Sequence, residues 1–389
     1  MATSKEGSSI WRRGTLLVLT GLVLLLPSVR PASAELLYLT EGNRLRRVDL
    51  DALYAGHVVE EVFIEAAARP EDAPSVHEGG RRDINGMVCR FPDGSGRFVA
   101  SEDTGQPGTR PGWGVFSAEG VQIGKLTATY RAELGDPYGC AFDSAGRLFT
   151  TSVGNKGFGA SKGQLLLWFP PYDTFPGRPG EYPDTDASSA SFCKLASDIG
   201  TAGAGAIDAE GRVYVASSSR GAIHRFSPPF PRSPDREGGC AARDALGSPL
   251  ADGVEREVFA RGLYTFAGLA FSASGSLYAS SVFTGEIVEI DPQGEVVRTL
   301  LDPPGLLPPF ETGTPHGIAV DSRGTLYYAD LDLTWDFPGI DTGPNGKVWR
   351  IRFDADGAPL EPELVLEGLA FPDAVSVLPG SLEESPRGQ

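Results

Sequence analysis

One pattern of apolar and polar positions recurs along the chain. Each copy has an apolar segment, a polar turn that ends in glycine and a second apolar segment. Four copies share this template, and their first template positions are Gly139, Ala204, Gly268 and Gly317. The turn glycine follows seven residues later in each, and a fifth copy with a longer turn starts at Asn85-Gly86. Short apolar segments between glycine turns predict antiparallel β-strands, and their repetition predicts equivalent, stacked units.

Each copy continues into further apolar segments that complete a four-stranded unit. Third strands are expected at 222–226, 286–290 and 347–351, and outer strands at 257–259 and 296–300. The segment 371–377 has the pattern of an inner strand and 36–40 that of a second strand, so the two ends together complete a sixth unit. We therefore predict an all-β, six-bladed β-propeller over residues 35–380, with four antiparallel strands per blade. Both ends of the chain would form the first blade and close the ring. A pair of β-sandwiches is the alternative.

The predicted blades bring two sets of residues to one face of the ring, which we call the mouth face. Each inner strand starts on the face where the second strand of its blade ends. The residues at the inner-strand starts are His316, Asp373, Asn85, Tyr138, Gly203 and Ala267. The residues at the second-strand ends are Asp330, Glu41, Glu102, Ser152, Ser217 and Ser281. The ionisable members all belong to three neighbouring blades, which predicts a functional site at the mouth of the central channel.

Longer loops at the mouth face add candidate ligand contacts. The connections after Glu102, Ser152 and Asp330 are longer than the corresponding connections of blades 4 and 5, and long loops on a rigid scaffold commonly carry binding residues. The residues predicted to bind substrate are Glu102, Asp103, Trp113, Tyr138, Asn155, Asp330 and Trp335. Structural roles are the alternative. Glu41, Glu102 and Asp330 would then be solvated rim charges, and Asn85, Asp373 and His316 would cap strands or fill the channel.

The chemistry of these side chains allows two functions. Carboxylates, an amide oxygen and an imidazole suit a hard divalent cation or general acid-base catalysis. The first hypothesis is a metal-dependent lactone or ester hydrolase, in which Asp373 or His316 activates water. Its metal ligands would be Asn85, Asp373 and Glu41, and calcium is the favoured ion. The second hypothesis is a non-catalytic propeller that binds a small ligand or a partner protein. The sequence does not decide between an enzyme and a binding module.

The copy that contains Gly317, PHGIAVDSRGTLYYAD at 315–330, resembles the repeat of the NHL-repeat and gluconolactonase/regucalcin superfamily of six-bladed propellers. The resemblance covers essentially all of 35–380, and it implies the fold rather than one activity, since such propellers include hydrolases, lyases and binding modules. Gluconolactonase-like members usually hold calcium or a similar ion with Glu, Asn, Asn and Asp from successive inner strands. Asn85 matches an Asn position and Asp373 stands where the Glu usually lies. Tyr138 and Gly203 depart from the pattern at the remaining positions.

The N-terminus predicts export. Basic residues at Lys5, Arg12 and Arg13 precede the apolar segment 16–26, and Ala32-Ser33-Ala34 has the small-residue pattern of a signal peptidase site. We predict a signal peptide over 1–34, a periplasmic or extracellular protein and a disordered tail over 381–389. A membrane anchor is the alternative, but the apolar segment is shorter than the ~20 residues of a spanning helix, so no stable insertion is expected after cleavage.

The charge of the chain limits the classes of partner that it can bind. The chain has a net charge of −17, and removal of 1–34 takes away four basic residues and one acidic residue, which leaves −20. Such an acidic protein is not expected to bind nucleic acid, and we expect a monomer.

An oxidising compartment would permit disulfides. We expect Cys89 and Cys140, which lie in apolar strands, as buried thiols, and we leave open a bridge between Cys193 and Cys240. The proline-rich stretches 169–190 and 228–254 are expected as long loops on the opposite face, either as decoration or as a docking surface.

Overall fold

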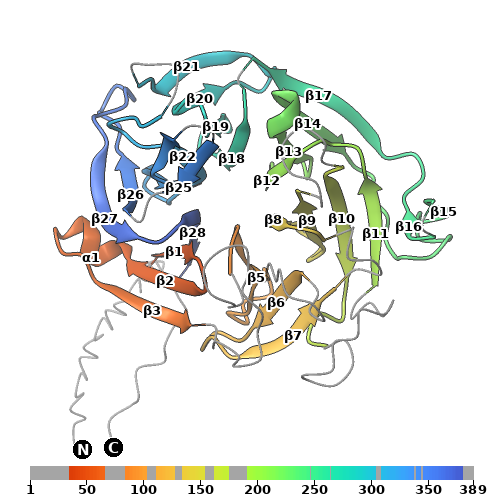
Figure 1. The fold of residues 1–389 in the computed structure, drawn as a ribbon. Helices are drawn as coiled ribbons and strands as arrows, with labels where there is room; N and C mark the ends of the chain where they lie inside the picture. The colour runs from red at the N-terminus through yellow and green to blue at the C-terminus, as the bar shows by residue number, and fades with distance from the viewer. Residues whose placement is uncertain are drawn as a thin grey trace, which may run out of the picture. The chain divides into compact units, whose positions relative to one another are not determined.

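A computed structural model describes residues 35–65, 84–102, 111–127, 134–153, 162–174, 191–245, 247–262, 264–303, 308–336, 339–342 and 345–379. Its strands form six sheets that follow one another around a ring, each built on four antiparallel strands, and the sheet of blade 3 carries two further strands (Figure 1). The predicted six-bladed β-propeller is therefore confirmed. The predicted signal peptide and C-terminal tail lie outside the described residues, and both stay predictions. Within the described ranges, no helix is long and apolar enough to cross a membrane.

Blade 1 joins the two ends of the chain as predicted. Its inner strand is C-terminal, and it pairs antiparallel with the first strand of the chain from Leu36 opposite Leu378 to Thr40 opposite Ala374. The strands of blade 1, from the channel outward, are β28 (Pro372–Pro379), β1 (Glu35–Glu41), β2 (Arg44–Asp49) and β3 (Glu60–Glu65). The short helix α1 (Leu50–Tyr54) follows β2. Because blade 1 takes strands from both ends of the chain, the pairing of β28 with β1 closes the ring.

The other blades follow in chain order. Blade 2 consists of β4 (Val88–Arg90), β5 (Phe98–Glu102), β6 (Gly112–Phe116) and β7 (Gln122–Leu126). Blade 3 consists of β8 (Pro137–Phe142), β9 (Leu148–Ser152), β10 (Gln164–Phe169) and β11 (Ser191–Ala196). Blade 4 consists of β12 (Ala202–Ile207), β13 (Val213–Ser217), β14 (Ala222–Ser227) and β17 (Glu255–Arg261), with the 3-10 turn η2 (Ser218–Arg220) after β13.

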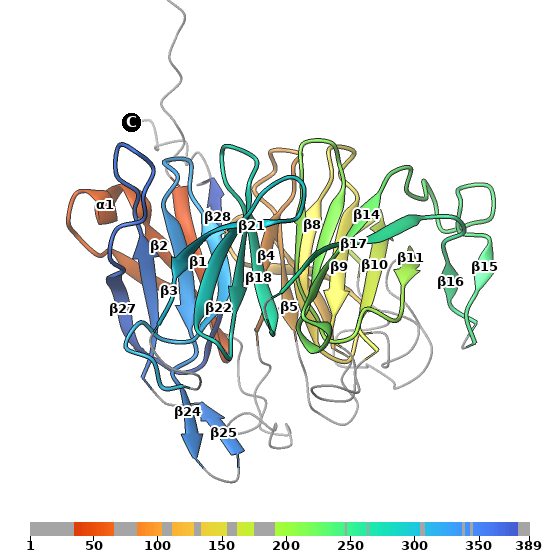
Figure 2. The same cartoon turned by 90° about the horizontal axis from the view of Figure 1, so that it is seen from above.

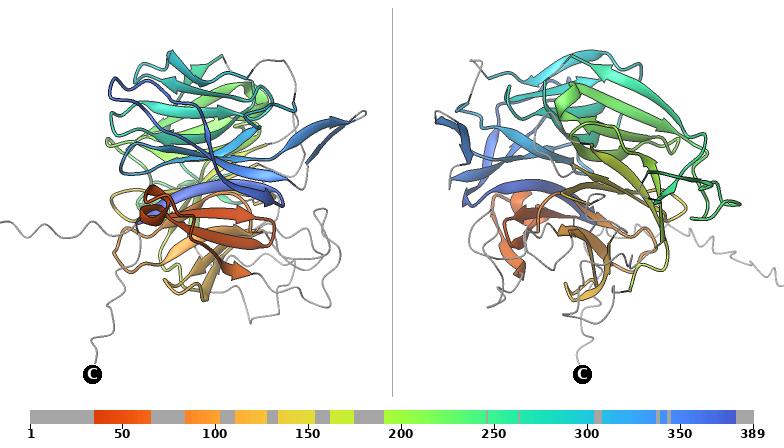
Figure 3. Two further views of the ribbon diagram at one scale, coloured as in Figure 1. Left: turned by 90° about the vertical axis from the view of Figure 1, so that its left-hand side faces the viewer. Right: turned by 45° about the vertical axis from the view of Figure 1, so that its right-hand side comes forward.

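Blade 5 consists of β18 (Phe266–Phe271), β19 (Leu277–Ser281), β20 (Glu286–Ile290) and β21 (Val296–Leu301). Blade 6 consists of β22 (Pro315–Val320), β23 (Leu326–Asp330), β26 (Gly346–Ile351) and β27 (Glu363–Leu369). Between its second and third strands, blade 6 carries a hairpin of β24 (Leu333–Asp336) and β25 (Gly339–Thr342). This hairpin projects from the ring at the lower edge of Figure 2 and again in the left view of Figure 3.

The repeat template folds locally through its turns. In the turn after β22, the carboxylate of Asp321 accepts hydrogen bonds from the backbone N–H groups of Arg323 and Thr325, each over 2.9 Å. Asp143 and Asp208 accept the equivalent bonds in their own blades. The turn then needs a left-handed residue, and Gly324 supplies it with φ 83°. The core lies between neighbouring blades, where large side chains such as Trp113, Trp168 and Tyr327 are fully buried.

The segment 228–254 is an extension of blade 3 and not a free loop. It leaves β14 of blade 4 and adds β16 (Pro249–Leu250) beside β11, followed by β15 (Ala242–Arg243), to the sheet of blade 3. A disulfide between Cys193 and Cys240 and an ion pair between Lys194 and Asp244 hold it there. The bridge that the sequence left open is therefore present.

The expectation that Cys89 and Cys140 are buried thiols is wrong. These residues form a second disulfide, and their Cα atoms are 6.0 Å apart. Cys89 lies on the inner strand of blade 2 and Cys140 on the inner strand of blade 3. Apolar strand context predicts burial, but only the packing of neighbouring inner strands places the two sulfur atoms within bonding distance.

Candidate functional site at the channel mouth

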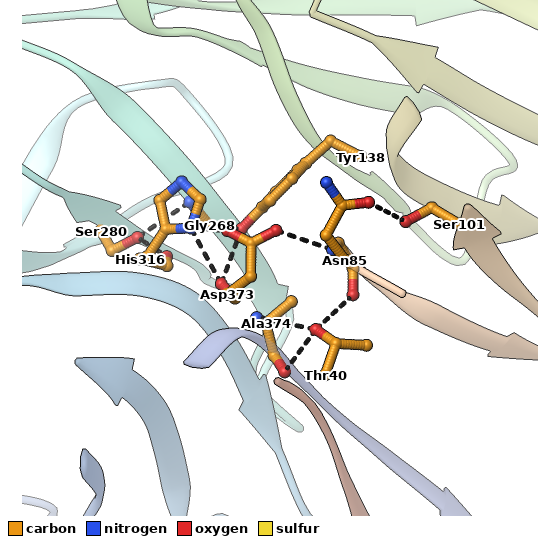
Figure 4. Close-up of polar contacts among 10 residues, drawn as sticks. Thr40, Asn85, Ser101, Tyr138, Gly268, Ser280, His316, Asp373 and Ala374 are labelled. Carbon is orange, nitrogen blue, oxygen red and sulfur yellow. Dashed lines mark hydrogen bonds and ion pairs between the residues drawn. The ribbon is translucent and has the colours of Figure 1, made fainter. Parts of the chain in front are cut away.

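The inner-strand starts meet around the channel as the sequence predicts. Tyr138, Gly203, Ala267, His316 and Asp373 are each the second residue of an inner strand. Tyr138 belongs to blade 3, yet its hydroxyl lies 3.0 Å from Nδ1 of His316 on blade 6 and 3.2 Å from the carbonyl oxygen of Asp373 on blade 1. The tyrosine side chain therefore spans the channel (Figure 4).

His316 and Asp373 form a hydrogen-bonded pair. Nδ1 of His316 lies 2.8 Å from carboxylate oxygen Oδ1 of Asp373 and 2.8 Å from its carbonyl oxygen. Two acceptors on one residue place the proton on Nδ1, so the neutral imidazole presents Nε2 as its basic nitrogen. Nε2 points away from Asp373 in Figure 4, and no described residue hydrogen-bonds it. The His316 side chain is 20% exposed, whereas Asp373 is 6% exposed.

The second carboxylate oxygen of Asp373 is held by the backbone of blade 2. Oδ2 accepts a 2.8 Å hydrogen bond from the backbone N–H of Gly86 on blade 2. Gly86 has φ 68°, and a Cβ there would lie 2.5 Å from the carbonyl oxygen of Tyr138. Only glycine therefore allows the backbone to approach this closely. Burial raises the pKa of the Tyr138 hydroxyl well above its ordinary value, and the charges of Asp373 and Asp136 add to the effect. The hydroxyl thus stays protonated and donates.

A set of hydroxyls that the sequence analysis did not single out joins the inner strands. Thr40, Thr151 and Ser280 each lie one residue before a second-strand end. Each accepts a hydrogen bond from a backbone N–H on the inner strand of its own blade. Each also donates one to a backbone carbonyl of the next blade, which belongs to Gly86, Gly203 or His316. The acceptor for Ser280 is His316 itself, over 2.5 Å. In the sequence, a hydroxyl residue stands one position before the second-strand end in blades 1, 3 and 5, and also in blade 2, where Ser101 bonds Asn85 instead.

The acidic residues at the second-strand ends are buried by the fold. Glu41, Glu102 and Asp330 are 4%, 2% and 1% exposed, so the alternative of solvated rim charges is wrong. Glu41 pairs with Arg46 and accepts a hydrogen bond from the N–H of Ala370. Such partners lie on the third and outer strands. The positions of the second-strand ends in the sequence therefore did not predict them.

Glu102 and Asp330 are held in the same way. Glu102 pairs with Lys125 over 2.7 Å and accepts a 2.8 Å hydrogen bond from Gln122. Asp330 accepts hydrogen bonds from the N–H of Thr314 over 2.8 Å and from the indole of Trp349 over 3.2 Å. Glu102 is thus held by the outer strand of blade 2, and Asp330 by the residue before β22 and by the third strand of blade 6.

The remaining predicted contacts divide into two groups. Trp113 is fully buried in the core between blades 2 and 3, beside Leu126 and Trp168. Asp103 and Asn155 lie outside the described residues, as does the side chain of Trp335. Asn85 lies just before β4, and its amide oxygen accepts a 3.0 Å hydrogen bond from Ser101.

The predicted calcium ligands are each held by protein donors. Calcium takes six to eight oxygen ligands. Both carboxylate oxygens of Asp373 are engaged by His316 and Gly86, and the amide oxygen of Asn85 is engaged by Ser101. Glu41 is paired with Arg46. Among the described residues, no three His, Cys, Asp or Glu side chains are placed to share a metal ion. We therefore assign the steps of the reaction proposed below to protein side chains.

Comparisons with known proteins place the chain by its fold. No protein-family model and no curated protein matches the chain. A chain of a nidogen/laminin complex is similar in structure, with a TM-score of 0.51 and 14% identity over 88% of this chain and 98% of that one. The shared feature is the fold. It is the propeller fold that the resemblance of the sequence implied.

Two further structures are similar at a lower score. A protein of unknown function from Bacteroides caccae has a TM-score of 0.49 and 11% identity over 89% of this chain and 99% of that one. A streptogramin B lyase has a TM-score of 0.48 and 12% identity over 90% of this chain and 88% of that one.

Proposed function

We propose that this propeller is an exported hydrolase of ester or lactone bonds, with His316 as the general base. The single observation that supports the proposal is the hydrogen-bonded pair of Asp373 and His316 at the channel. The pair fixes the histidine tautomer that leaves Nε2 basic, and His316 is the more exposed of the two side chains. A buried carboxylate that orients a histidine in this way is a recurrent arrangement for general-base catalysis.

The reaction uses these residues as follows. Nε2 of His316 takes a proton from water while the water oxygen attacks the carbonyl carbon of the ester or lactone. The carboxylate of Asp373 stabilises the resulting imidazolium through Nδ1–H. When the tetrahedral intermediate collapses, the C–O bond to the alcohol breaks, and the imidazolium returns the proton to the departing oxygen. The products are a carboxylic acid and an alcohol, which remain one molecule when the substrate is a lactone.

The compartment forms part of the proposal. Two disulfides are consistent with an oxidising location, and the N-terminal pattern predicts cleavage after Ala34. Mass spectrometry of the protein recovered from the medium or the periplasm would then give a mature N-terminus at Glu35. An uncleaved N-terminus would contradict export by this route.

The test is hydrolysis of a panel of aryl esters and lactones. The variant His316→Gln keeps a polar side chain of similar size, and we expect its kcat/KM to fall about 10²–10⁴-fold, the usual contribution of a general base. Asp373→Asn should also lose activity, because a neutral amide cannot stabilise the imidazolium charge as the carboxylate does. His57→Gln changes an exposed histidine and serves as the matched control. Full activity in a folded His316→Gln protein would overturn the proposal.

A second candidate is a non-catalytic propeller that binds a protein partner. The specific support is the similarity to a chain of the nidogen/laminin complex, which is itself a protein assembly. This candidate predicts no turnover across the whole panel. It also predicts that partner binding survives His316→Gln, because a docking surface does not depend on the basic nitrogen.

A further inference from the structure

Two short segments of blades 2 and 3 hold the pair of His316 and Asp373. The backbone N–H of Gly86 donates to Oδ2 of Asp373. The hydroxyl of Tyr138 contacts Nδ1 of His316 and the carbonyl oxygen of Asp373 (Figure 4). The two segments also bond one another, because the N–H of Met87 donates a 2.7 Å hydrogen bond to the carbonyl oxygen of Tyr138. A change in the spacing of blades 2 and 3 would therefore disturb both contacts of the pair together.

The segment that carries Gly86 lies outside the strand pairing of its own blade. Strand β4 begins only at Val88, which pairs with Ala100 of β5. In the other blades the inner strand begins one residue before the channel residue. The backbone N–H groups of Gly86 and Met87 donate instead to blades 1 and 3. Contacts with the neighbouring blades therefore set the position of this segment.

The junction of blades 2 and 3 is built differently from three other junctions of the ring. Hydroxyl side chains connect blade 1 to the inner strand of blade 2, blade 3 to that of blade 4 and blade 5 to that of blade 6; the residues are Thr40, Thr151 and Ser280. In blade 2 the hydroxyl at the equivalent position belongs to Ser101, and it bonds Asn85 of its own blade. At this junction the two inner strands are joined by a disulfide instead.

The Cys89–Cys140 disulfide lies directly beside the two segments. Cys89 is two residues after Met87, and Cys140 is two residues after Tyr138. Sγ of Cys140 lies 3.7 Å from the carbonyl oxygen of Met87. The packing here leaves little room, since a Cβ at Gly86 would lie 2.8 Å from Cα of Tyr138. The covalent bond therefore limits how far these two segments can move apart.

We propose that the Cys89–Cys140 disulfide positions the pair of His316 and Asp373, so that full activity requires this bond. The inference rests on the proposed hydrolysis. The disulfide acts through the Gly86 segment and through Tyr138, which contact the pair from two sides. Without the bond, blades 2 and 3 separate slightly, and the carboxylate of Asp373 no longer holds the imidazole in one orientation. A small displacement of a catalytic group lowers the rate of the chemical step.

The second disulfide of the chain provides a matched control. Cys89 and Cys140 are 51 positions apart, and Cys193 and Cys240 are 47 positions apart. The second bond holds the extension at the outer edge of blade 3, away from the inner strands. In the chain-entropy model, the stabilisation by a disulfide depends on the length of the loop that it closes. The two double variants to serine should therefore lose similar stability in urea, so that a difference in activity reports the position of the bond.

The first test compares the kinetics of the two double variants on one ester of the panel. We expect kcat of Cys89→Ser/Cys140→Ser to fall about 10–100-fold, because the pair is displaced. KM should change less than about twofold, since the disulfide acts on the pair and not on substrate binding. Cys193→Ser/Cys240→Ser should keep the wild-type kcat. Equal kcat in the two folded variants would overturn the inference and leave hydrolysis itself intact.

The second test observes the pair without turnover. The chain has four histidines, and in protein with isotope-labelled histidine the Nδ1–H resonance of His316 is assigned by its loss in His316→Gln. We expect this resonance to persist in Cys193→Ser/Cys240→Ser and to shift or broaden in Cys89→Ser/Cys140→Ser. If it does so but the wild type hydrolyses no ester, the positioning role stands and the proposed hydrolysis fails. An unchanged resonance in both variants would overturn the positioning role.

A third measurement applies if Cys89→Ser/Cys140→Ser does not fold. The Cys193→Ser/Cys240→Ser protein then carries the Cys89–Cys140 bond alone, and dithiothreitol is raised until alkylation and mass spectrometry show that half of this bond is reduced. Dithiothreitol converts the bond into two thiols and is itself oxidised to a cyclic disulfide. Activity and the His316 resonance should decline in step with reduction while circular dichroism stays constant. Activity that outlasts the bond, or that is lost only with the fold, would overturn the inference.

Discussion

The hydroxyl of Ser280 on blade 5 donates a 2.5 Å hydrogen bond to the carbonyl oxygen of His316 on blade 6. The hydroxyl oxygen of Ser280 in turn accepts a 2.8 Å hydrogen bond from the N–H of Gly268 on blade 5. One side chain thus joins two inner strands at the residue that we propose as the base. Thr40 and Thr151 make the equivalent connections from blade 1 to blade 2 and from blade 3 to blade 4.

Ser280→Ala should weaken both the fold and the site. The substitution leaves the N–H of Gly268 and the carbonyl of His316 without this partner, and a buried polar group that loses its partner costs about 1–3 kcal/mol. Urea unfolding should show a loss of this size, and kcat/KM should fall because the His316 backbone is less well held. Ser274→Ala removes a hydroxyl from an exposed turn and should change neither. Wild-type stability in Ser280→Ala would show that the connection contributes nothing.

The sequence was sufficient to predict the ring of blades. The apolar segments of the template and its turn glycines, such as Gly211 and Gly324, determine each hairpin through local contacts. The closure by both chain ends followed because 36–40 and 371–377 each lacked a neighbour within their own unit. Local pattern and architecture agree in a repeat protein, since each unit makes the same contacts as the next.

The site was predicted less completely, because its chemistry depends on contacts between blades. The convergence of His316, Asp373 and Tyr138 followed from their equivalent positions. Their hydrogen bonds did not, since the tyrosine reaches across the channel. The burial of Glu102 depended on Lys125, a residue of the outer strand of the same blade. A periodic pattern gives positions, but it does not give the partner that a charged side chain finds in three dimensions.

The buried pair of Lys125 and Glu102 provides a test of that structural role. Both side chains are 2% exposed. Lys125→Met should cost about 3–5 kcal/mol, because it leaves a buried carboxylate without its cation. The double variant Lys125→Met with Glu102→Gln should recover much of the loss, since no buried charge remains. Equilibrium unfolding in denaturant measures both. If Glu102→Gln alone abolished substrate binding at unchanged stability, its predicted role in binding would be supported instead.

His224 on β14 predicts how stability depends on pH. Burial lowers its pKa to about 4, and the charges of Arg256, Arg220 and Arg261 add to this, while Asp198 opposes it. In the unfolded chain the same side chain takes up a proton near pH 6.5. Between these values the unfolded state binds the extra proton, so the free energy of unfolding decreases as the pH falls. The contribution of His224 to that free energy is fully present above about pH 6.5 and is lost as the pH falls toward 4.

The measurement compares His224→Gln with the wild type across that range. The difference in unfolding free energy between the two proteins should shrink steadily as the pH falls from about 6.5 to 4. Carboxylates titrate in the same range, but they do so in both proteins and cancel in the difference. His57→Gln, which changes an exposed histidine, should give a difference that does not vary with pH. A constant difference for His224→Gln would mean that His224 titrates normally in the folded protein.

Removal of divalent metal ions should leave hydrolysis unchanged. The oxygens that a calcium ion would need at Asp373 and Asn85 already accept hydrogen bonds from Gly86 and Ser101, and one oxygen of Asp373 holds His316. Protein purified without chelator should contain no stoichiometric calcium, zinc or manganese by plasma mass spectrometry, and its activity should survive dialysis against EDTA. Asp354→Asn, in an exposed hairpin turn, serves as the control for loss of one carboxylate. One ion per chain that is lost in Asp373→Asn, but kept in Asp354→Asn, would make Asp373 a metal ligand. Asp373 would then hold the ion rather than the His316 imidazole, and the proposal that this pair acts as the general base would fail.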